Sequence, residues 1–234
     1  AACSHGHVDA ARLLLDNGAE VDRAAEDGET PLYIACYKGH VDAARLLLEK
    51  GADVNKADIF DQTPLYAACQ QGQVDAARLL LENGAEVDRA DKDGATPLYA
   101  ACSHGHVDAA RLLLDNGAEV DRAAEDGTTP LHIACEEGRV DLARLLLEKD
   151  AEVDRADKDG RTPLYIACQE GHVDVARLLL EHGAVLDEHG SSALYEGAAV
   201  EVRYRGRERY YPGKISRNCG EGKYDIAYDD GDRE

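Results

Sequence analysis

Apolar and polar residues follow the same order again and again along this chain, with a period of 33 residues. In residues 41–48 the apolar side chains are spaced for one face of a helix, and Asp42 and Arg45 are left for solvent. Residues 30–36 form a shorter apolar stretch that opens with Thr-Pro, a favourable helix start because threonine caps free amides and proline presets φ. The pattern therefore predicts two helices in every period.

Two further features mark the period. Thr-Pro-Leu opens five repeats, and glycine follows the second helix in most of them, where it supplies a left-handed cap. Asp150 stands in place of that glycine and is expected to cost stability locally. Six cysteines, each 33 residues after the last, keep the same register: Cys3, Cys36, Cys69, Cys102, Cys135 and Cys168. A fixed period of this length is typical of stacked supersecondary units.

The repeated block D-G-x-T-P-L-Y-x-A-C-x-x-G-H-V-D-x-A-R-L-L-L-E-x-G-A-x-V-D resembles the ankyrin repeat over residues 1–190. The resemblance implies an α-helical repeat solenoid with β-hairpin loops, made of a half repeat and five whole ones. Residues 1–28 are identical to residues 100–127, which suggests duplication of a block of three repeats. No methionine is present and Ala1 lies in the middle of a repeat, so we expect a fragment of a longer protein.

The family resemblance also implies a scaffold that binds a protein partner through its hairpin tips and first-helix faces. Positions that vary between repeats should mark this surface. They are Tyr37, Lys38, Ile59, Phe60, Gln70, Gln71, His104, Glu136, Glu137, Gln169 and Glu170. We predict that Ile59 and Phe60 replace the usual Asp-Gly of the tip. Phe60, the chain's single phenylalanine, is either an exposed interface anchor or a side chain tucked into its loop.

Charge adds a preference for the partner. The chain carries a net charge of −21, and about 20 of those negative charges fall within residues 1–190. Such a surface attracts cationic segments and repels phosphates, although it also serves solubility alone. We expect a basic protein partner, no nucleic acid, no membrane segment and a monomeric chain.

The cysteines indicate a compartment. Neighbouring repeats should hold them too far apart for the Cα spacing of roughly 4.4–6.8 Å that a disulfide needs. Reduced, buried thiols suit an intracellular protein of the nucleus or cytoplasm.

Three sequence patterns contain residue types that could bind a metal or act in catalysis, but none of them predicts such a site. Cys102, His104 and His106 have metal-binding side chains at close spacing, but the cysteine should point into the stack. Residues 91–94 begin like a calcium loop and lack its final glutamate. His132 occupies a position where the family histidine satisfies backbone groups. We predict no catalytic residue, no metal and no cofactor.

The period ends before residues 191–197, which we interpret as a linker. In residues 198–234 three short stretches alternate apolar and polar residues: 200–204, 210–215 and 224–228. They predict a small β-barrel. Because the chain stops at Glu234, we expect this barrel to be incomplete and to lack its final strand.

Aromatic spacing in this segment resembles the Tudor family. That resemblance implies a cage for a methylated lysine or arginine, built from Tyr204, Tyr211, Tyr228 and Asp230. Aromatic faces attract a quaternary ammonium, and a carboxylate adds to the attraction. Two alternatives stay open, because the tyrosines would also suit the core of a structural barrel, and alternate arginines in residues 203–209 would also suit phosphates.

The combined prediction is a non-catalytic adaptor, in which an acidic ankyrin scaffold is joined to a Tudor-like reader of methylated residues. A histone tail would satisfy both parts. The alternatives are a generic scaffold with a structural barrel, and the interaction region of an enzyme whose catalytic domain lies outside these residues.

Overall fold

The structure of the chain is a computed structural model that describes residues 5–185, 199–203, 210–220 and 223–228. It divides into two units, Ala1–Glu125 and Asp126–Glu234, which are described in turn. No helix in these described ranges is both long and apolar enough to cross a membrane.

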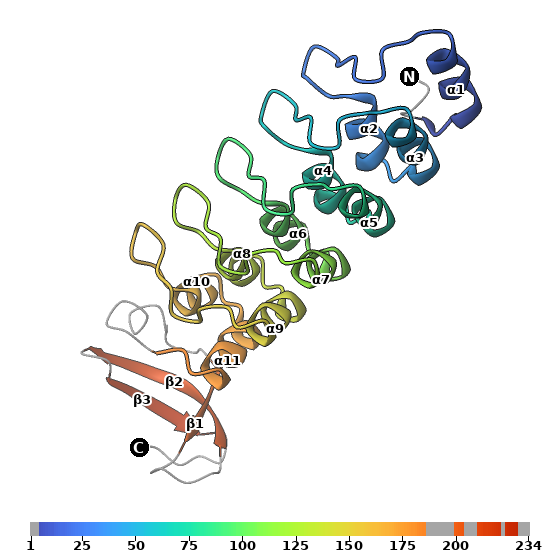
Figure 1. Cartoon of the computed structure of the whole chain (residues 1–234). Helices are drawn as coiled ribbons and strands as arrows, with labels where there is room; N and C mark the ends of the chain where they lie inside the picture. The colour runs from blue at the N-terminus through green and yellow to red at the C-terminus, as the bar shows by residue number, and fades with distance from the viewer. Residues whose placement is uncertain (1–4, 186–198, 204–209, 221–222, 229–234) are drawn as a thin grey trace. The chain divides into compact units, whose positions relative to one another are not determined.

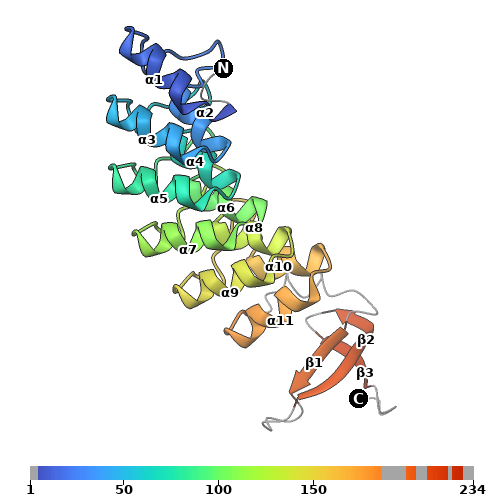
Figure 2. The same cartoon turned by 90° about the vertical axis from the view of Figure 1, so that its right-hand side faces the viewer.

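Unit 1 contains two layers of helices (Figures 1 and 2). Short first helices pack against one another in one layer, and longer second helices pack in the other. The first helices are α2 (Pro31–Tyr37), α4 (Pro64–Gln70) and α6 (Pro97–His104). The second helices are α1 (Val8–Asp16), α3 (Val41–Glu49), α5 (Val74–Glu82) and α7 (Val107–Asp115). Two helices per period are present, as the pattern predicted.

Unit 2 continues the same alternation and ends in strands. Its first helices are α8 (Pro130–Glu136) and α10 (Pro163–Gln169), and its second helices are α9 (Val140–Glu148) and α11 (Val173–Glu181). The strands are β1 (Ala199–Arg203), β2 (Tyr210–Gly220) and β3 (Lys223–Tyr228).

Every first helix starts at the threonine of Thr-Pro-Leu. The side chains of Thr30, Thr63, Thr96, Thr129 and Thr162 each accept a hydrogen bond from the backbone N–H three residues on. Proline follows each of them at the first helical position, where its missing N–H costs nothing. The predicted cap is confirmed.

The second helices end in a left-handed residue. Gly18, Gly51, Gly84, Gly117 and Gly183 have φ between 85° and 90°. Asp150 adopts the same region, with φ 64°, at the end of α9. An L-residue is strained in this region, so the local cost predicted at this position has a structural basis.

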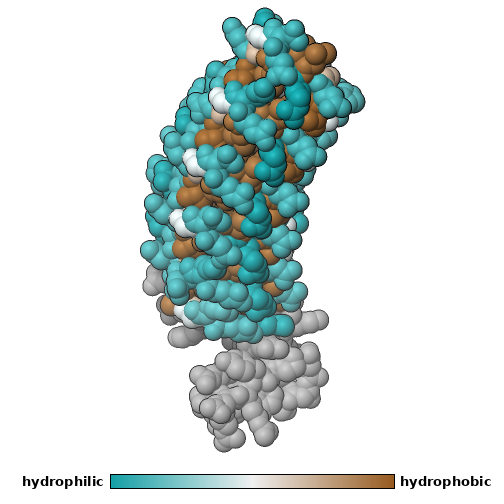
Figure 3. Space-filling view, turned by 45° about the vertical axis from the view of Figure 1, so that its right-hand side comes forward, coloured by the Kyte–Doolittle hydropathy of each residue, from teal (hydrophilic) through white to brown (hydrophobic). Residues whose placement is uncertain are grey.

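The core is built from leucine and small residues. The leucine of each Thr-Pro-Leu is at most 1% exposed, and the alanines and cysteines beside it are also buried. The α1 helix is an exception. Leu13 and Leu14 are 65% and 56% exposed, whereas their counterparts Leu112 and Leu113 in α7 are 7% and 0% exposed. Figure 3 shows hydrophobic residues at the surface of this N-terminal end, at the top of the view.

Side chains from one repeat bind the backbone of the next. The acid that ends Ala-x-Val-Asp accepts a hydrogen bond from a backbone N–H 31 residues later, as from Asp53 to Asp22 at 3.2 Å and from Glu119 to Asp88 at 3.1 Å. Asn55 does the same for Glu86 at 3.0 Å. These polar links run parallel to the apolar packing and fix the spacing of the repeats within unit 1.

The strands form one antiparallel sheet in the order β1-β2-β3. Val202 pairs with Tyr211, and Gly213 pairs with Tyr228. All three predicted strand stretches coincide with strands, although β2 runs on to Gly220 through two register shifts. Closure into a barrel is not among the features of the described residues, so the Tudor-like barrel stays a prediction.

Candidate functional site

The predicted partner residues on the first helices lie in pairs at the helix ends. Tyr37 ends α2 and is followed by Lys38, whose Nζ lies 5.0 Å from the centre of the Tyr37 ring. Gln70 ends α4 and is followed by Gln71, and His104 ends α6. Lys38 and His104 are exposed, while the other three are half-buried. Unit 1 therefore presents one such pair or single residue per repeat.

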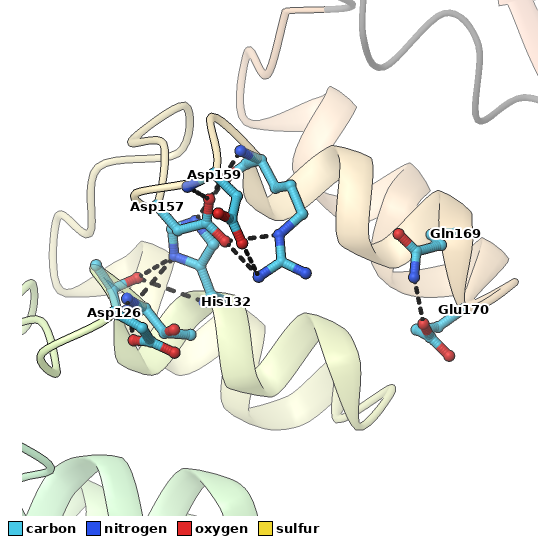
Figure 4. A network of polar contacts seen from close by, with 9 residues as sticks. Asp126, His132, Asp157, Asp159, Gln169 and Glu170 are labelled. Carbon is cyan, nitrogen blue, oxygen red and sulfur yellow. Dashed lines mark hydrogen bonds and ion pairs between the residues drawn. The ribbon is translucent and has the colours of Figure 1, made fainter. Parts of the chain in front are cut away.

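Unit 2 shows the same arrangement with acids. Glu136 ends α8 and is followed by Glu137, and Gln169 ends α10 and is followed by Glu170. All four side chains are exposed. Gln169 donates a hydrogen bond from Nε2 to Glu170 Oε1 at 3.0 Å, seen in Figure 4.

The backbone at these helix ends is already bound by the following repeat. His106 Nε2 lies 3.1 Å from the Gln70 carbonyl oxygen, and His172 Nε2 lies 2.9 Å from that of Glu136. Because a carbonyl only accepts, both nitrogens carry the proton. The two histidines satisfy helix-terminal carbonyls, which leaves the side chains of the predicted residues to face a partner.

Gly72 permits this contact. A Cβ at Gly72 would lie 2.5 Å from His106 Nδ1, and φ is 64° there. The glycine at this turn is thus required both by its conformation and by the His106 ring that packs on it.

The hairpin tip that contains Phe60 and Asp61 departs from the Asp-Gly of the other tips. The replaced positions lie one residue further along the chain than predicted. Phe60 stands at the aspartate position, and Asp61 stands at the glycine position, with φ 62° against 84° at Gly28 and 79° at Gly94. Ile59 therefore replaces the residue before Asp-Gly. The prediction that Ile59 and Phe60 replace Asp-Gly was wrong by one residue, because the 33-residue period aligns Phe60 with Asp27 and Asp61 with Gly28, and the positive φ of Asp61 agrees with that alignment.

Neighbouring tips in unit 1 are linked by backbone hydrogen bonds. Ile59 N–H donates to Asp27 O at 3.0 Å, and Lys92 N–H donates to Phe60 O at 3.0 Å. Glu125 N–H donates to Asp93 O at 2.8 Å. The tips are held against one another instead of standing apart in solvent.

Carboxylates crowd the tips around Ile59. Glu29 is half-buried, and burial together with the charges of Asp27 and Asp58 raises the pKa of its carboxyl. Burial and then the charges of Asp58 and Glu29 likewise raise the pKa of the Tyr33 hydroxyl. These groups repel one another, so a cation placed here would lower their electrostatic energy.

Sequence reasoning missed the role of the Thr-Pro-Leu-Tyr tyrosines. Tyr33 is 5% exposed, and its hydroxyl donates to Gln62 Oε1 at 3.4 Å in the next hairpin. Gln62 Nε2 in turn donates to Asp91 Oδ2 at 3.5 Å, one hairpin further on. The periodic tyrosine was visible in the sequence, but its partner 29 residues away was not.

In unit 2, His132 takes the place of that tyrosine. Thr129 N–H donates to His132 Nδ1 at 3.2 Å, and His132 Nε2 donates to the Arg161 carbonyl at 3.1 Å. Figure 4 shows His132 beside the hairpin that carries Asp157 and Asp159. Burial lowers the pKa of His132, so the ring is held neutral with both nitrogens bonded. Satisfying backbone groups was the role predicted for this histidine.

Asp157 is a buried acid that sequence reasoning did not single out. Its side chain is 1% exposed and receives Arg161 Nη2 at 2.8 Å. It also accepts from Arg161 Nε at 2.8 Å and from the backbone N–H groups of Asp159 and Arg161 at 2.9 Å. The carboxylate is fully satisfied and shapes its hairpin, which assigns it to structure.

The side chains of the metal-like motif in unit 1, Cys102, His104 and His106, are engaged in packing and hydrogen bonds within the repeats. Cys102 is buried, and the rings of His104 and His106 stack with centroids 6.5 Å apart. His104 Nδ1 bonds to the Ala100 carbonyl at 3.0 Å. Within the described ranges no group of three or more His, Cys, Asp or Glu residues is arranged so that it could hold a metal ion.

The described repeat cysteines are free, and each is buried. They are Cys36, Cys69, Cys102, Cys135 and Cys168. Burial raises the pKa of all five thiols, to about 12 at Cys102 and about 11 at Cys168, which leaves little thiolate to react.

Two of the predicted cage residues lie in the sheet. Tyr211 is in β2 and Tyr228 is in β3, while Tyr204 and Asp230 lie outside the described residues. Val202 pairs with Tyr211 and Gly213 with Tyr228. The two tyrosines therefore lie in neighbouring, hydrogen-bonded strands of one sheet.

Comparison with known proteins agrees with this architecture. A family model described as "Ankyrin repeats (3 copies)" matches residues 1–58, 55–124 and 120–189. Among solved structures, the crystal structure of the human ASB11 ankyrin repeat domain is 35% identical, covers 80% of this chain and 83% of its own, and superposes with a TM-score of 0.72. No curated protein matches. The chain belongs to the ankyrin-repeat family, whose repeats bind other proteins.

Proposed function

We propose that the chain is a non-catalytic adaptor whose acidic repeats bind a basic protein segment. The observation that carries the proposal is the recurrence, within each unit, of exposed or half-buried side chains at the C-terminal ends of the first helices. The next repeat satisfies the carbonyl groups of Gln70 and Glu136. The carboxylates of Glu136, Glu137 and Glu170, together with the net charge of −21, favour a cationic partner.

Charge reversal tests this surface. We expect a variant with Glu136→Lys and Glu137→Lys to bind a Lys/Arg-rich peptide more weakly than the parent, because it repels the ligand at the contact. Glu148→Lys with Asp141→Lys, on the exposed face of α9, changes the net charge by the same amount elsewhere. The two double variants are compared by fluorescence anisotropy over a range of salt concentrations. Equal loss in both would refute the placement of the surface and leave only a long-range charge effect.

The second candidate function concerns the sheet. We infer that residues 198–234 read a methylated lysine or arginine, and the position of Tyr211 and Tyr228 in neighbouring strands of one sheet supports this inference. Each aromatic face contributes roughly 0.5–2 kcal/mol toward a quaternary ammonium. A methylated histone tail is basic as well as methylated, so it would engage both parts of the chain.

Methyl dependence provides the test. Methylated and unmethylated histone peptides are titrated against the full chain, against Tyr228→Ala, and against Tyr210→Ala, whose position has the opposite parity to Tyr211. A reader loses methyl preference with Tyr228→Ala and keeps it with Tyr210→Ala. Equal binding of both peptides by the parent would leave a scaffold with a structural sheet.

Reduced buried thiols support an intracellular site of action, in the nucleus or cytoplasm.

A further inference from the structure

Six large apolar residues are exposed within the described residues: Leu13, Leu14, Ile59, Phe60, Leu180 and Val185. Four of them lie in the first or last helix of residues 5–185 or just after it. Ile59 and Phe60, which we call the apolar tip, lie inside the array and are 49% and 57% exposed. The loop phenylalanine is therefore not tucked in, which was the alternative left open by the sequence. Adjacent exposed apolar residues within a folded surface are typical of an interaction site.

The apolar tip is rigid before any partner arrives. Asp58 Oδ1 accepts hydrogen bonds from Phe60 N–H at 2.8 Å and from Gln62 N–H at 2.9 Å. The Ile59 and Phe60 backbones also bond to the tips before and after. An anchor fixed in this way loses little conformational entropy on binding, so more of its contact energy appears as affinity.

Backbone strain is retained at the same place. Asp61 keeps φ at 62°, where the tips at Gly28, Gly94, Gly127 and Gly160 have glycine. The turn geometry that projects Phe60 is thus preserved in spite of an unfavourable residue. Strained positions that persist in an otherwise regular scaffold cluster at functional sites.

Charge selects what can approach the apolar tip. Exposed Asp27, Asp61 and Asp93 stand on the three successive tips, and half-buried Glu29 is close enough to feel the charges of Asp27 and Asp58. Two basic residues lie nearby: Lys92 on the third of these tips, and Lys38, whose charge opposes the rise in the pKa of Glu29. A ligand with only an apolar side chain would leave the repulsion between these carboxylates unchanged. A ligand whose apolar side chain is flanked by basic residues would also neutralise their charge.

We propose that the apolar tip binds a peptide segment in which a large apolar side chain is flanked by lysine or arginine. This inference rests on the proposed scaffold function and adds the apolar residue and its location. The partner's apolar side chain packs on Phe60 and Ile59, and its flanking cations meet Asp27, Asp61 and Asp93.

The test uses the full chain and short fluorescein-labelled peptides with one leucine between two Lys-Arg pairs. In a second peptide serine replaces the leucine, and in a third glutamates replace the cations. Phe60→Asp restores the acid found at Asp27 and Asp93, and Phe60 is exposed enough for the change to leave the fold intact. Leu13→Asp makes the same change from an exposed apolar residue to an acid in α1, outside the apolar tip, so it serves as the matched control. Far-UV circular dichroism checks both variants.

We expect the parent and Leu13→Asp to prefer the leucine peptide over the serine peptide by about tenfold or more, as for a buried hot-spot contact. Phe60→Asp should lose this preference and still bind both basic peptides. Equal binding of leucine and serine peptides by the parent, or a preference that survives Phe60→Asp, would overturn the inference and leave the acidic scaffold standing. Failure of every basic peptide to bind would refute the scaffold proposal as well.

Discussion

Replacement of Asp150 by glycine should stabilise the protein. Asp150 follows α9, is exposed, and has φ 64°, while the equivalent residues of the other repeats are glycines. Its N–H bonds to Leu147 O at 3.1 Å, as the N–H of Gly51 bonds to Leu48 O at 3.0 Å. The turn is the same with either residue, so the substitution changes conformational preference and charge without removing a backbone contact.

Three contributions determine the size of the effect. A residue with a Cβ pays roughly 1–2 kcal/mol in the left-handed region, and aspartate lies at the lower end because its short polar side chain tolerates this region. A carboxylate at a helix C-terminus costs roughly 0.3–1 kcal/mol. Glycine gives back roughly 0.5–1 kcal/mol through its greater freedom in the unfolded chain. The net expectation for Asp150→Gly is a gain of about 1 kcal/mol.

Urea denaturation followed by far-UV circular dichroism measures the change, since the chain has no tryptophan. Hydrogen exchange of the α9 amides accompanies it, because a repeat array need not unfold in one step. Gly51→Asp is the mirror control, as no atom lies within 4 Å of a Cβ built there and only φ and charge oppose the change. Asp150→Asn removes the charge and keeps the Cβ. If Asp150→Gly is no more stable than the parent and Gly51→Asp is no less stable, the left-handed strain argument is wrong.

Three other outcomes follow from the structure. His132 has a pKa below its ordinary 6.5, so the unfolded chain takes up a proton that the folded chain refuses, and stability falls as pH drops through about 6.5; His132→Tyr should flatten urea midpoints across that range. Gly72→Ala should destabilise by about 1 kcal/mol more than Gly117→Ala, since both need positive φ but only Gly72 faces the His106 ring, and equal losses would disprove the contact. Prefixing residues 92–99 to the chain should bury the exposed leucines of α1 and fill a cavity of about 330 Å³ beside them, which an unchanged thermal midpoint would contradict.

Much of the local structure was predictable because the same helix-start and helix-end residues recur in each repeat. Thr-Pro at the start of every first helix and glycine after the second helix determine where helices begin and end. The exposed position of Arg45 and the buried one of Leu46 follow from helical spacing alone. Even the strands of residues 199–228 could be placed from simple alternation.

Contacts between repeats could not be predicted in the same way. The bond from Tyr33 to Gln62 joins residues 29 apart, and nothing in either local sequence identifies the other. The sequence does not distinguish Asp157 from the many exposed acids of the repeats, because its burial and its ion pair with Arg161 appear only in the folded hairpin.

The sequence by itself determined the period, the two helices of each repeat and the acidic character of the surface, because these depend on spacing, capping and charge that act within a few residues. Tertiary structure alone decided which identical residues become surface and which become core. Leu14 and Leu113 belong to identical stretches of sequence, yet one is 56% exposed and the other is 0% exposed. Burial depends on the neighbour that packs against a residue, and that neighbour is supplied by the stacking of repeats.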